Sequence, residues 1–335
     1  MLYKKLFLII SFSTTLLCAY KPAILMEVNI DKSNPSYVGL GEKAIKSFEN
    51  LYKIKVPIFS SQEYKYNKEK LITKTAKEGY NPIIALGFLY SKPIEKIAKQ
   101  FPNKTFVVID GNAHDAKNIL NINFKEEEGS FLVGSIAAMK TKSNVIGFVG
   151  GMDIPVIRRF ACGFIQGIKY INPNIKILLK MTGDDYKAFN NPIKGKKIAL
   201  DMISQKADVI FHASDRTGRG VIKAAKENKI FAIGVDSNQN SQAPGYVLTS
   251  MVKRIDVAIY RVLLDSMNNQ LDTKDRRLGL KEEGVSWALD KYNINLIDNK
   301  LQNKIDNIEF DIIQDAIKIE DYIQNNKCSA YNFNR

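Results

Sequence analysis

The chain has 335 residues, of which 45% are hydrophobic and 25% are charged, and its formal net charge is +14. This length exceeds what one hydrophobic core ordinarily organises, so we expect two domains. The lysines are scattered among glutamates without a basic block or stripe, which argues against a nucleic-acid partner and indicates a solvated, lysine-rich surface.

The first predicted element is an export signal. Two lysines precede an apolar stretch over residues 6–17, which is too short to span a bilayer as a helix. Cys18 follows directly, as in a bacterial lipobox, although Leu17 stands where a small residue is usual. An ordinary signal peptide or a chance cysteine is the alternative. We therefore expect residues 1–18 to direct export and Cys18 to carry lipid. The protein would then be held by lipid alone on a bacterial membrane, at its periplasmic face or outer surface.

Strand-like and helix-like segments alternate along the rest of the chain. Short apolar, β-prone runs predict buried strands, and segments with helical spacing predict the helices between them. The predicted strands are 23–28, 55–59, 82–87, 105–110, 145–149, 176–180, 207–213, 230–235 and 247–250. The predicted helices are 39–52, 66–78, 93–100, 131–139, 157–171, 194–205, 221–228, 254–267 and 310–323. This alternation predicts an α/β fold of two doubly wound parallel-sheet lobes with a cleft between them.

The domain boundaries follow from the same alternation. We assign residues 22–130, together with about 251–335 as a returning segment and tail, to an N-terminal lobe, and residues 131–250 to a C-terminal lobe. Cys162 and Cys328 could pair, but a chain of this size does not need a disulfide, so we predict a buried thiol at Cys162. Two histidines are too few for a zinc cluster, and we expect neither a metal nor a cofactor.

Two aspartates stand where a ligand site is expected. Asp110 follows the apolar run FVVI, and Asp236 follows AIGV. Ligands of open α/β sheets bind outside the carboxyl ends of the strands. Capping of a turn is the alternative for each aspartate, but one in each lobe favours a ligand site. Gly218 and Gly220 lie in a predicted turn between two strands of the second lobe, where a chain can take positive φ without steric cost.

Several blocks resemble a known family. They are FVVID at 106–110, EGSFLVG at 128–134, IGFVGGMDIP at 146–155, FACGFIQGIKYINP at 160–173 and AIGVDSNQ at 232–239. These blocks are similar to those of the basic membrane protein family, and the likeness covers almost all of the mature chain. The resemblance implies the type I periplasmic-binding-protein fold. It also implies a purine nucleoside as ligand and the permease of an ABC transporter as partner.

The resemblance also implies ligand-binding residues. Asp110 matches a ligand-contacting aspartate, and Asp236 matches the aspartate that binds the ribose. Lys253 in LTSMVK matches a site lysine, and Phe211 matches an aromatic before the glycine turn. Carboxylates and an ammonium suit charge-assisted hydrogen bonds to hydroxyls and base edges, and an aromatic face can stack a base. The alternatives are a core role for Phe211 and a surface position for Lys253.

The chain departs from the family pattern at two places. In NIDKSNPSYV, Asn29 replaces a common aspartate and Tyr37 replaces a stacking phenylalanine, whereas Val38 has no donor or acceptor for a base. In the turn after Phe211's strand, Asp215 and Arg216 replace two glycines. These side chains could narrow the cleft, pair with each other, or let Arg216 bind a different ligand.

We therefore predict a monomeric, non-enzymatic lipoprotein that binds a nucleoside, with a purine expected, for an ABC importer. The first alternative is a surface lipoprotein or adhesin whose nucleoside site is altered or lost. The second is a nucleoside-processing enzyme, for which the sequence offers no nucleophile–base pair and no metal cluster.

Overall fold

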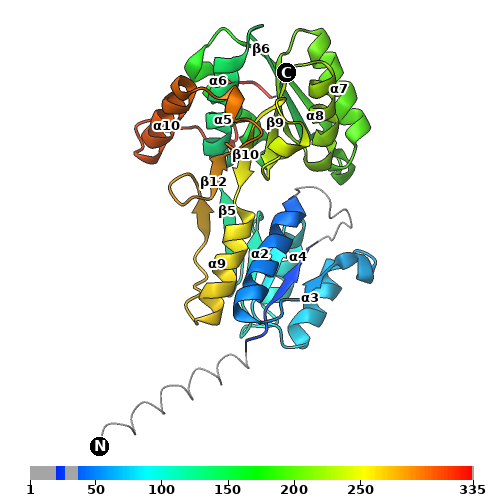
Figure 1. Ribbon diagram of the computed structural model, residues 1–335. Coiled ribbons are helices and arrows are strands. Elements are labelled where there is room, and N and C mark those ends of the chain that lie inside the picture. Colours follow the sequence, from blue (N-terminus) through cyan, green and yellow to red (C-terminus); the bar gives the residue numbers. More distant parts are fainter. Residues whose placement is uncertain (1–19, 27–36, 334–335) are drawn as a thin grey trace, which may run out of the picture. The chain divides into compact units, whose positions relative to one another are not determined.

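The computed structural model describes residues 20–26 and 37–333, which form two α/β units (Figure 1). The first lobe contains Val38–Asn123 and Ile255–Arg277, together with the first strand. The second lobe contains Phe124–Arg254 and Leu278–Arg335, and it includes Tyr37. Each lobe is built on one six-stranded sheet, so the predicted α/β architecture of two parallel-sheet lobes is confirmed. Among the described residues, no helix has the length and apolar character of a membrane span.

The sheet of the first lobe has the order β11-β5-β4-β3-β1-β2. Its strands are β1 (Ala23–Leu25), β2 (Ile58–Phe59), β3 (Ile83–Leu86), β4 (Phe106–Ile109), β5 (Ile119–Phe124) and β11 (Arg276–Leu278). Its helices are α2 (Tyr37–Tyr52), α3 (Lys68–Lys77), α4 (Ser91–Ala98) and α9 (Ile255–Met267). Helices α3 and α4 bury apolar side chains against one face of the sheet, and α2 packs beside Leu86 and Ile259 on the other. Both faces are thus covered, which explains why the inner strands are continuous apolar runs.

The sheet of the second lobe has the order β12-β10-β9-β8-β6-β7, with β12 antiparallel to β10. Its strands are β6 (Val145–Met152), β7 (Lys176–Gly183), β8 (Val209–Ala213), β9 (Phe231–Asp236), β10 (Val247–Lys253) and β12 (Val285–Trp287). Its helices are α5 (Glu126–Lys140), α6 (Pro155–Ile171), α7 (Pro192–Ser204), α8 (Gly218–Glu227), α10 (Asn299–Ile313) and α11 (Tyr322–Asn325). Helices α7 and α8 share one apolar cluster with the sheet. Phe164 of α6 packs on the opposite face against Phe148 and Phe211.

Helices α5 and α6 approach each other closely because two glycines of α6 face the backbone of α5. A Cβ at Gly163 would lie 2.4 Å from the Glu127 carbonyl oxygen, and a Cβ at Gly167 would lie 2.0 Å from that of Phe131. Any side chain at either position would force the helices apart. This contact fixes the start of α5, where Glu126 lies, against α6.

Strand β5 was not predicted, because its apolar run is interrupted by Asn121. In the structure Asn121 is buried, and its side chain donates to the Ala113 carbonyl and to Asp275 at 2.9 and 3.0 Å. These partners satisfy the polar group inside the sheet. Tertiary contacts therefore satisfy the asparagine inside a strand whose apolar run is interrupted.

The C-terminal tail differs from the prediction in both its lobe and its helix. Residues beyond 278 belong to the second lobe, where β12 pairs with β10. The helix predicted at 310–323 is wrong: α10 begins earlier, after the N-cap Asp298, and ends at Ile313. Asp315 then adopts φ 57°, a left-handed conformation that is incompatible with a continuing helix.

The prediction of a free thiol at Cys162 is also wrong. Cys162 of α6 forms a disulfide with Cys328 at a sequence separation of 166 residues. Beside it, Tyr322 accepts a hydrogen bond from Arg158 at 2.7 Å. The last described segment is therefore fastened to α6, and this contact could not be read from the spacing of the two cysteines.

Candidate functional site

Three predicted site residues lie at one edge of the second sheet. Asp236 ends β9, Lys253 ends β10, and Arg216 lies in the short 3₁₀ turn Asp215–Thr217 that follows β8. Strands β8, β9 and β10 are parallel neighbours, and Val252 is in register with Asp236. Their carboxyl ends therefore meet at the same edge, which is where open α/β sheets bind ligands.

Asp110 and Asp236 share an unusual backbone conformation. Asp110 follows β4 of the first lobe with φ 63°, and Asp236 ends β9 of the second lobe with φ 61°. Positive φ is uncommon outside glycine and tends to occur where a chain turns sharply or serves a site. After Asp236 the turn is tight, because the Ser237 amide donates to the Val235 carbonyl at 2.7 Å. Each lobe thus has one aspartate whose backbone turns away at the end of a central strand.

Lys253 is buried, with 2% of its surface exposed. Its Nζ lies 3.1 Å from Glu126 Oε1 and 3.9 Å from Asp236 Oδ1. The same ammonium lies over the rings of Tyr37, Phe124 and Phe160, at 5.4–5.6 Å from their centroids. The alternative of a surface lysine is therefore wrong: carboxylates and aromatic faces replace the water that this charge would otherwise hold. The structure thereby brings Tyr37, Lys253 and Asp236 together.

Behind Lys253 lies a chain of buried charges that the sequence analysis missed. Arg159 of α6 donates to Glu126 Oε2 at 2.9 Å and to Asp321 at 2.8 and 3.2 Å. Burial would raise the pKa of the Glu126 carboxyl, but attraction to Lys253 and Arg159 outweighs it and holds this pKa below its usual value. Glu126 is therefore ionised. An arginine within the apolar run of α6 was the one signal in the sequence for this network.

Phe211 does not lie at the ligand edge. It is fully buried, and its ring contacts Phe148 at 5.5 Å and Phe164 at 4.9 Å between centroids. This position favours the core role that the sequence left open. The neighbouring His212 points to the other face, where its Nε2 lies 3.0 Å from Gln239 Oε1. Burial lowers the pKa of His212 to about 4, against the pull of this hydrogen bond, so the imidazole is neutral at neutral pH.

The two glycines after β8 serve close packing, and neither uses the positive φ that glycine allows. Gly218 has φ −61° and begins α8. A Cβ there would lie 1.9 Å from the His212 ring, and a Cβ at Gly220 would lie 1.9 Å from the Pro192 carbonyl oxygen. The residue with positive φ in this turn is Asp215, at 45°. Burial raises the pKa of its carboxyl, against the attraction of Arg216 and Arg219.

Two buried hydroxyls at this edge lack a hydrogen-bond partner among the described residues. Ser214 Oγ follows β8 and Ser237 Oγ follows Asp236, and the two residues are 0% and 4% exposed. A buried polar group without a partner costs about 1–3 kcal/mol. Such groups beside a strand-end carboxylate are suited to a polar ligand. Of the other predicted residues, Asn29 and Cys18 lie outside the described part of the chain.

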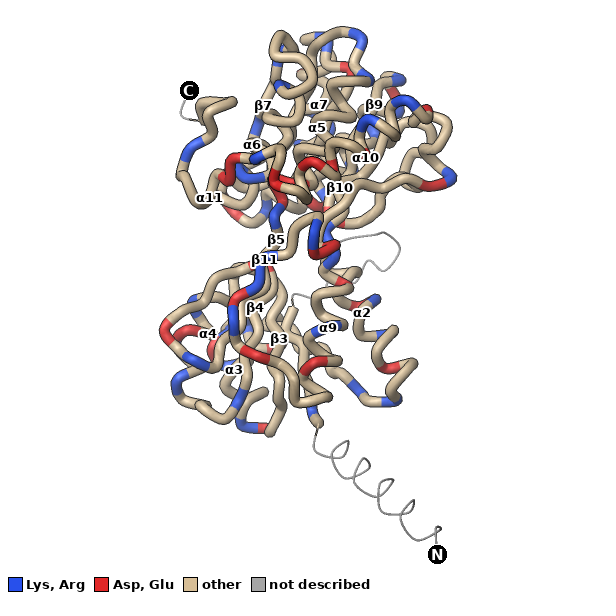
Figure 2. The backbone as a smooth tube through the Cα atoms, turned by 90° about the vertical axis from the view of Figure 1, so that its left-hand side faces the viewer, with Lys and Arg blue, Asp and Glu red and all other residues tan. Residues whose placement is uncertain are grey.

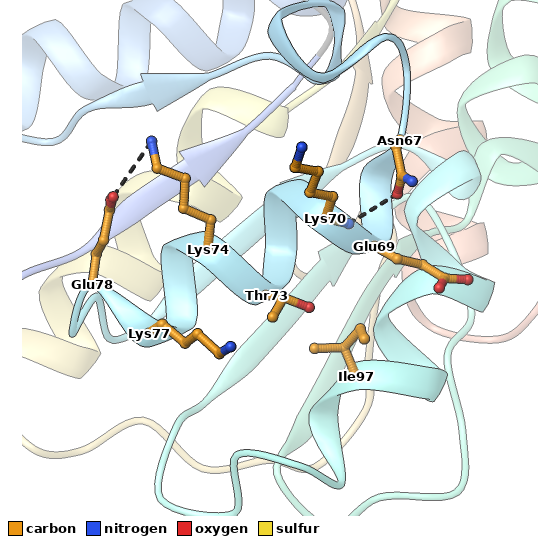
Figure 3. Close-up of a pocket in the computed structure, with 8 residues that line it drawn as sticks. All are labelled: Asn67, Glu69, Lys70, Thr73, Lys74, Lys77, Glu78 and Ile97. Atoms are coloured by element: carbon orange, nitrogen blue, oxygen red, sulfur yellow. Dashed lines mark hydrogen bonds and ion pairs between the residues drawn. The ribbon is translucent and has the colours of Figure 1, made fainter.

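A separate shallow groove of about 510 Å³ runs along α3 and α4 of the first lobe (Figure 3). Its lining is mostly exposed lysine and glutamate, and Lys74 pairs with Glu78 at 3.4 Å. Lys96 of α4 similarly pairs with Glu69 at 2.7 Å. Figure 2 shows the same mixture of positive and negative residues along both lobes. None of the residues that line the groove is among the buried polar groups that lack a partner in the described part of the chain.

The sequence is similar to those of known proteins. The sequence profile of the family described as "ABC transporter substrate-binding protein PnrA-like" matches residues 31–322. A CD4+ T-cell-stimulating antigen of Listeria innocua is 34% identical over 281 residues, which cover 79% of this chain and 72% of that protein. The ABC transporter nucleoside-binding protein BmpA of Lactococcus lactis is 30% identical over 258 residues, or 70% of each chain.

A solved structure shares the fold. The solute-binding protein of an ABC transporter system from Aeropyrum pernix superposes with a TM-score of 0.80. The match covers 90% of this chain and 93% of that one, at 24% sequence identity. At this identity the likeness establishes the fold alone.

Proposed function

The chain belongs to the family of PnrA-like substrate-binding proteins of ABC transporters, and we propose that it binds a purine nucleoside for import. The nucleoside-binding relative supports this ligand class. The observation that carries the proposal is the edge of the second sheet, where Asp236 ends β9. Two buried hydroxyls that follow β8 and β9 have no hydrogen-bond partner among the described residues. Ribose hydroxyls can donate to Asp236, and the serine hydroxyls can bond to the sugar or the base.

The remaining predicted residues take roles in this proposal that fit their chemistry. Lys253 neutralises part of the charge of Asp236 and can donate to a ligand oxygen. Tyr37 is the aromatic candidate for the base, since Phe211 belongs to the core. Asp110 is proposed as a second carboxylate, and Arg216 as a further donor near Asp236. Asn29 is proposed to contact the base edge.

Two measurements test the proposed ligand. Mass spectrometry of small molecules released from the purified protein should identify a nucleoside, and calorimetry should show binding of adenosine or guanosine in preference to uridine. Binding of uridine alone would overturn the purine preference. Failure of all three to bind would overturn the nucleoside proposal and favour a surface lipoprotein whose site has changed.

We expect binding without chemistry. The candidate site contains no nucleophile–base pair among the described residues, and its one nearby histidine is buried and neutral. Adenosine incubated with the protein should therefore be recovered intact by chromatography. Release of free adenine at a rate that scales with protein, and that disappears in Asp236→Ala, would instead identify an enzyme.

We also propose that Cys18 carries a lipid anchor, because it directly follows the apolar segment 6–17. Metabolic labelling with a radioactive fatty acid should mark the wild type and leave Cys18→Ala unmarked, with Leu17→Ala as a matched control that keeps the label. Equal labelling of the wild type and Cys18→Ala would contradict the anchor. More than one acyl chain is expected, since a single chain gives only marginal membrane binding.

A further inference from the structure

A line of buried charges links the C-terminal segment to the candidate ligand edge. It begins at Asp321, continues through Arg159 and Glu126, and ends at Lys253, whose side chain is 3% exposed. Every interaction along the line is a hydrogen bond of 2.8–3.2 Å. From Lys253 a distance of 3.9 Å remains to Asp236. We propose that Asp321, Arg159 and Glu126 are positioning residues that set how close the Lys253 ammonium stands to Asp236. This inference rests on the nucleoside-binding function proposed above.

The position of Lys253 depends on which donor each of the two Glu126 oxygens accepts from. Oε1 accepts from Lys253 and Oε2 accepts from Arg159. Arg159 is held back in turn by two contacts to Asp321, while its Nε lies 3.6 Å from Glu127. If Asp321 lost its charge, Arg159 would move toward the remaining carboxylates. Glu126 would then hold Lys253 less strongly.

A released ammonium lies near a second carboxylate, that of Asp236. Along the line, two cations, Lys253 and Arg159, face four carboxylates, Glu126, Glu127, Asp321 and Asp236. When its hydrogen bond to Glu126 weakens, the Lys253 ammonium moves toward Asp236, from which it is 3.9 Å away. That contact occupies the acceptor that a ribose hydroxyl needs. Disturbing the far end of the line should therefore weaken ligand binding without touching the ligand.

The far end is well anchored, which the proposal requires. Asp321 caps α11 by accepting from the Ile323 amide at 2.9 Å. The disulfide between Cys162 and Cys328 fastens the same segment to α6. Asp321 is thus held against α6, the helix that contains Arg159, although Asp321 and Arg159 are 162 residues apart in sequence.

A double-mutant cycle tests the proposal, with adenosine or guanosine as the probe, whichever the wild type binds. Asp321→Asn should weaken binding about two- to thirty-fold, and Glu126→Gln should weaken it at least as much. If Asp321 acts through Glu126, Asp321→Asn should change the affinity no further in the Glu126→Gln background. The midpoint of thermal unfolding should fall with Asp321→Asn in both backgrounds, because Arg159 loses a partner in each. Asp315→Asn, an exposed substitution of the same kind in the same tail, should leave binding unchanged.

Two results would overturn the positioning line. One is Glu126→Gln binding the probe as tightly as the wild type. The other is Asp321→Asn costing the same factor in both backgrounds, which would assign Asp321 a structural role alone. If the wild type binds neither probe, the proposed function itself fails, and that outcome is distinct from a wild type that binds but shows no coupling.

Discussion

Asp236→Ala is expected to weaken purine nucleoside binding by about ten- to several-hundred-fold. The substitution leaves ribose hydroxyls without their acceptor at an edge where two further hydroxyls are already buried. It also leaves the Lys253 ammonium without its second carboxylate, at 3.9 Å. The fold should survive, because the Asp236 side chain lies at a strand end and is 15% exposed. Calorimetry measures the affinity, and circular dichroism checks the fold.

A ligand without ribose hydroxyls separates this role from a general loss of binding. A 2′,3′-dideoxy nucleoside should bind the wild type poorly and should lose little more in Asp236→Ala. Asp184→Ala is the matched control, since Asp184 is an exposed aspartate that follows β7 of the same sheet. Asp184→Ala should bind the ribonucleoside as tightly as the wild type. If Asp236→Ala binds the ribonucleoside as tightly as the wild type, Asp236 is only a turn residue and the site lies elsewhere.

Arg159→Met is expected to destabilise the second lobe by about 3–5 kcal/mol at pH 7. The substitution removes the guanidinium that three buried carboxylates share, those of Glu126, Glu127 and Asp321. Methionine keeps much of the apolar volume of the arginine stem, so the loss reports the unpaired charges rather than a cavity. Urea unfolding followed by tryptophan fluorescence and circular dichroism measures the difference.

The loss of unfolding free energy in Arg159→Met should decrease as the pH is lowered, because the substitution changes the pKa of Glu126. In the wild type its pKa is lowered, so the stability it contributes is present above its usual pKa and is lost as pH falls through the lowered value. In Arg159→Met, the attraction and the hydrogen bonds of Arg159 no longer oppose burial, so the pKa of Glu126 should rise above that of the wild type. As the pH falls, Glu126 is then protonated in the variant before it is protonated in the wild type, and its uncompensated charge disappears. The difference in free energy of unfolding between the two proteins should therefore be smaller at about pH 5 than at pH 7.

Arg158→Met is the control for this experiment. Arg158 is the neighbouring residue on α6, but its side chain is 22% exposed and its carboxylate partner Asp153 is 35% exposed. A partly exposed pair of this kind contributes about 0–1 kcal/mol. Arg158 also donates to Tyr322 at 2.7 Å, but it leaves no buried carboxylate unpaired, so Arg158→Met should cost less than Arg159→Met. Equal losses for Arg158→Met and Arg159→Met, or a loss for Arg159→Met that does not change with pH, would contradict the importance of the buried network.

The sequence by itself determined the elements whose signals are local. Alternating apolar strands and helical spacing predicted two parallel-sheet α/β lobes, because both patterns depend only on neighbouring residues. The same patterns placed Asp110 and Asp236 at the ends of central strands, and the structure puts each there. Strand ends are local features, so candidate ligand residues next to them could be predicted before any tertiary contact was known.

Only the tertiary structure decided the partners of those residues. Lys253 lies 127 residues from Glu126 in sequence, and Cys162 lies 166 residues from Cys328. No local pattern encodes such pairs, so neither the burial of Lys253 nor its partners could be predicted, and a thiol that was predicted to be free forms a disulfide. Phe211 joined the core because Phe148 and Phe164 meet it from a strand and a helix distant in sequence. Burial and charge pairing arise from packing between segments, and the chemistry around Asp236 is therefore a property of the folded chain.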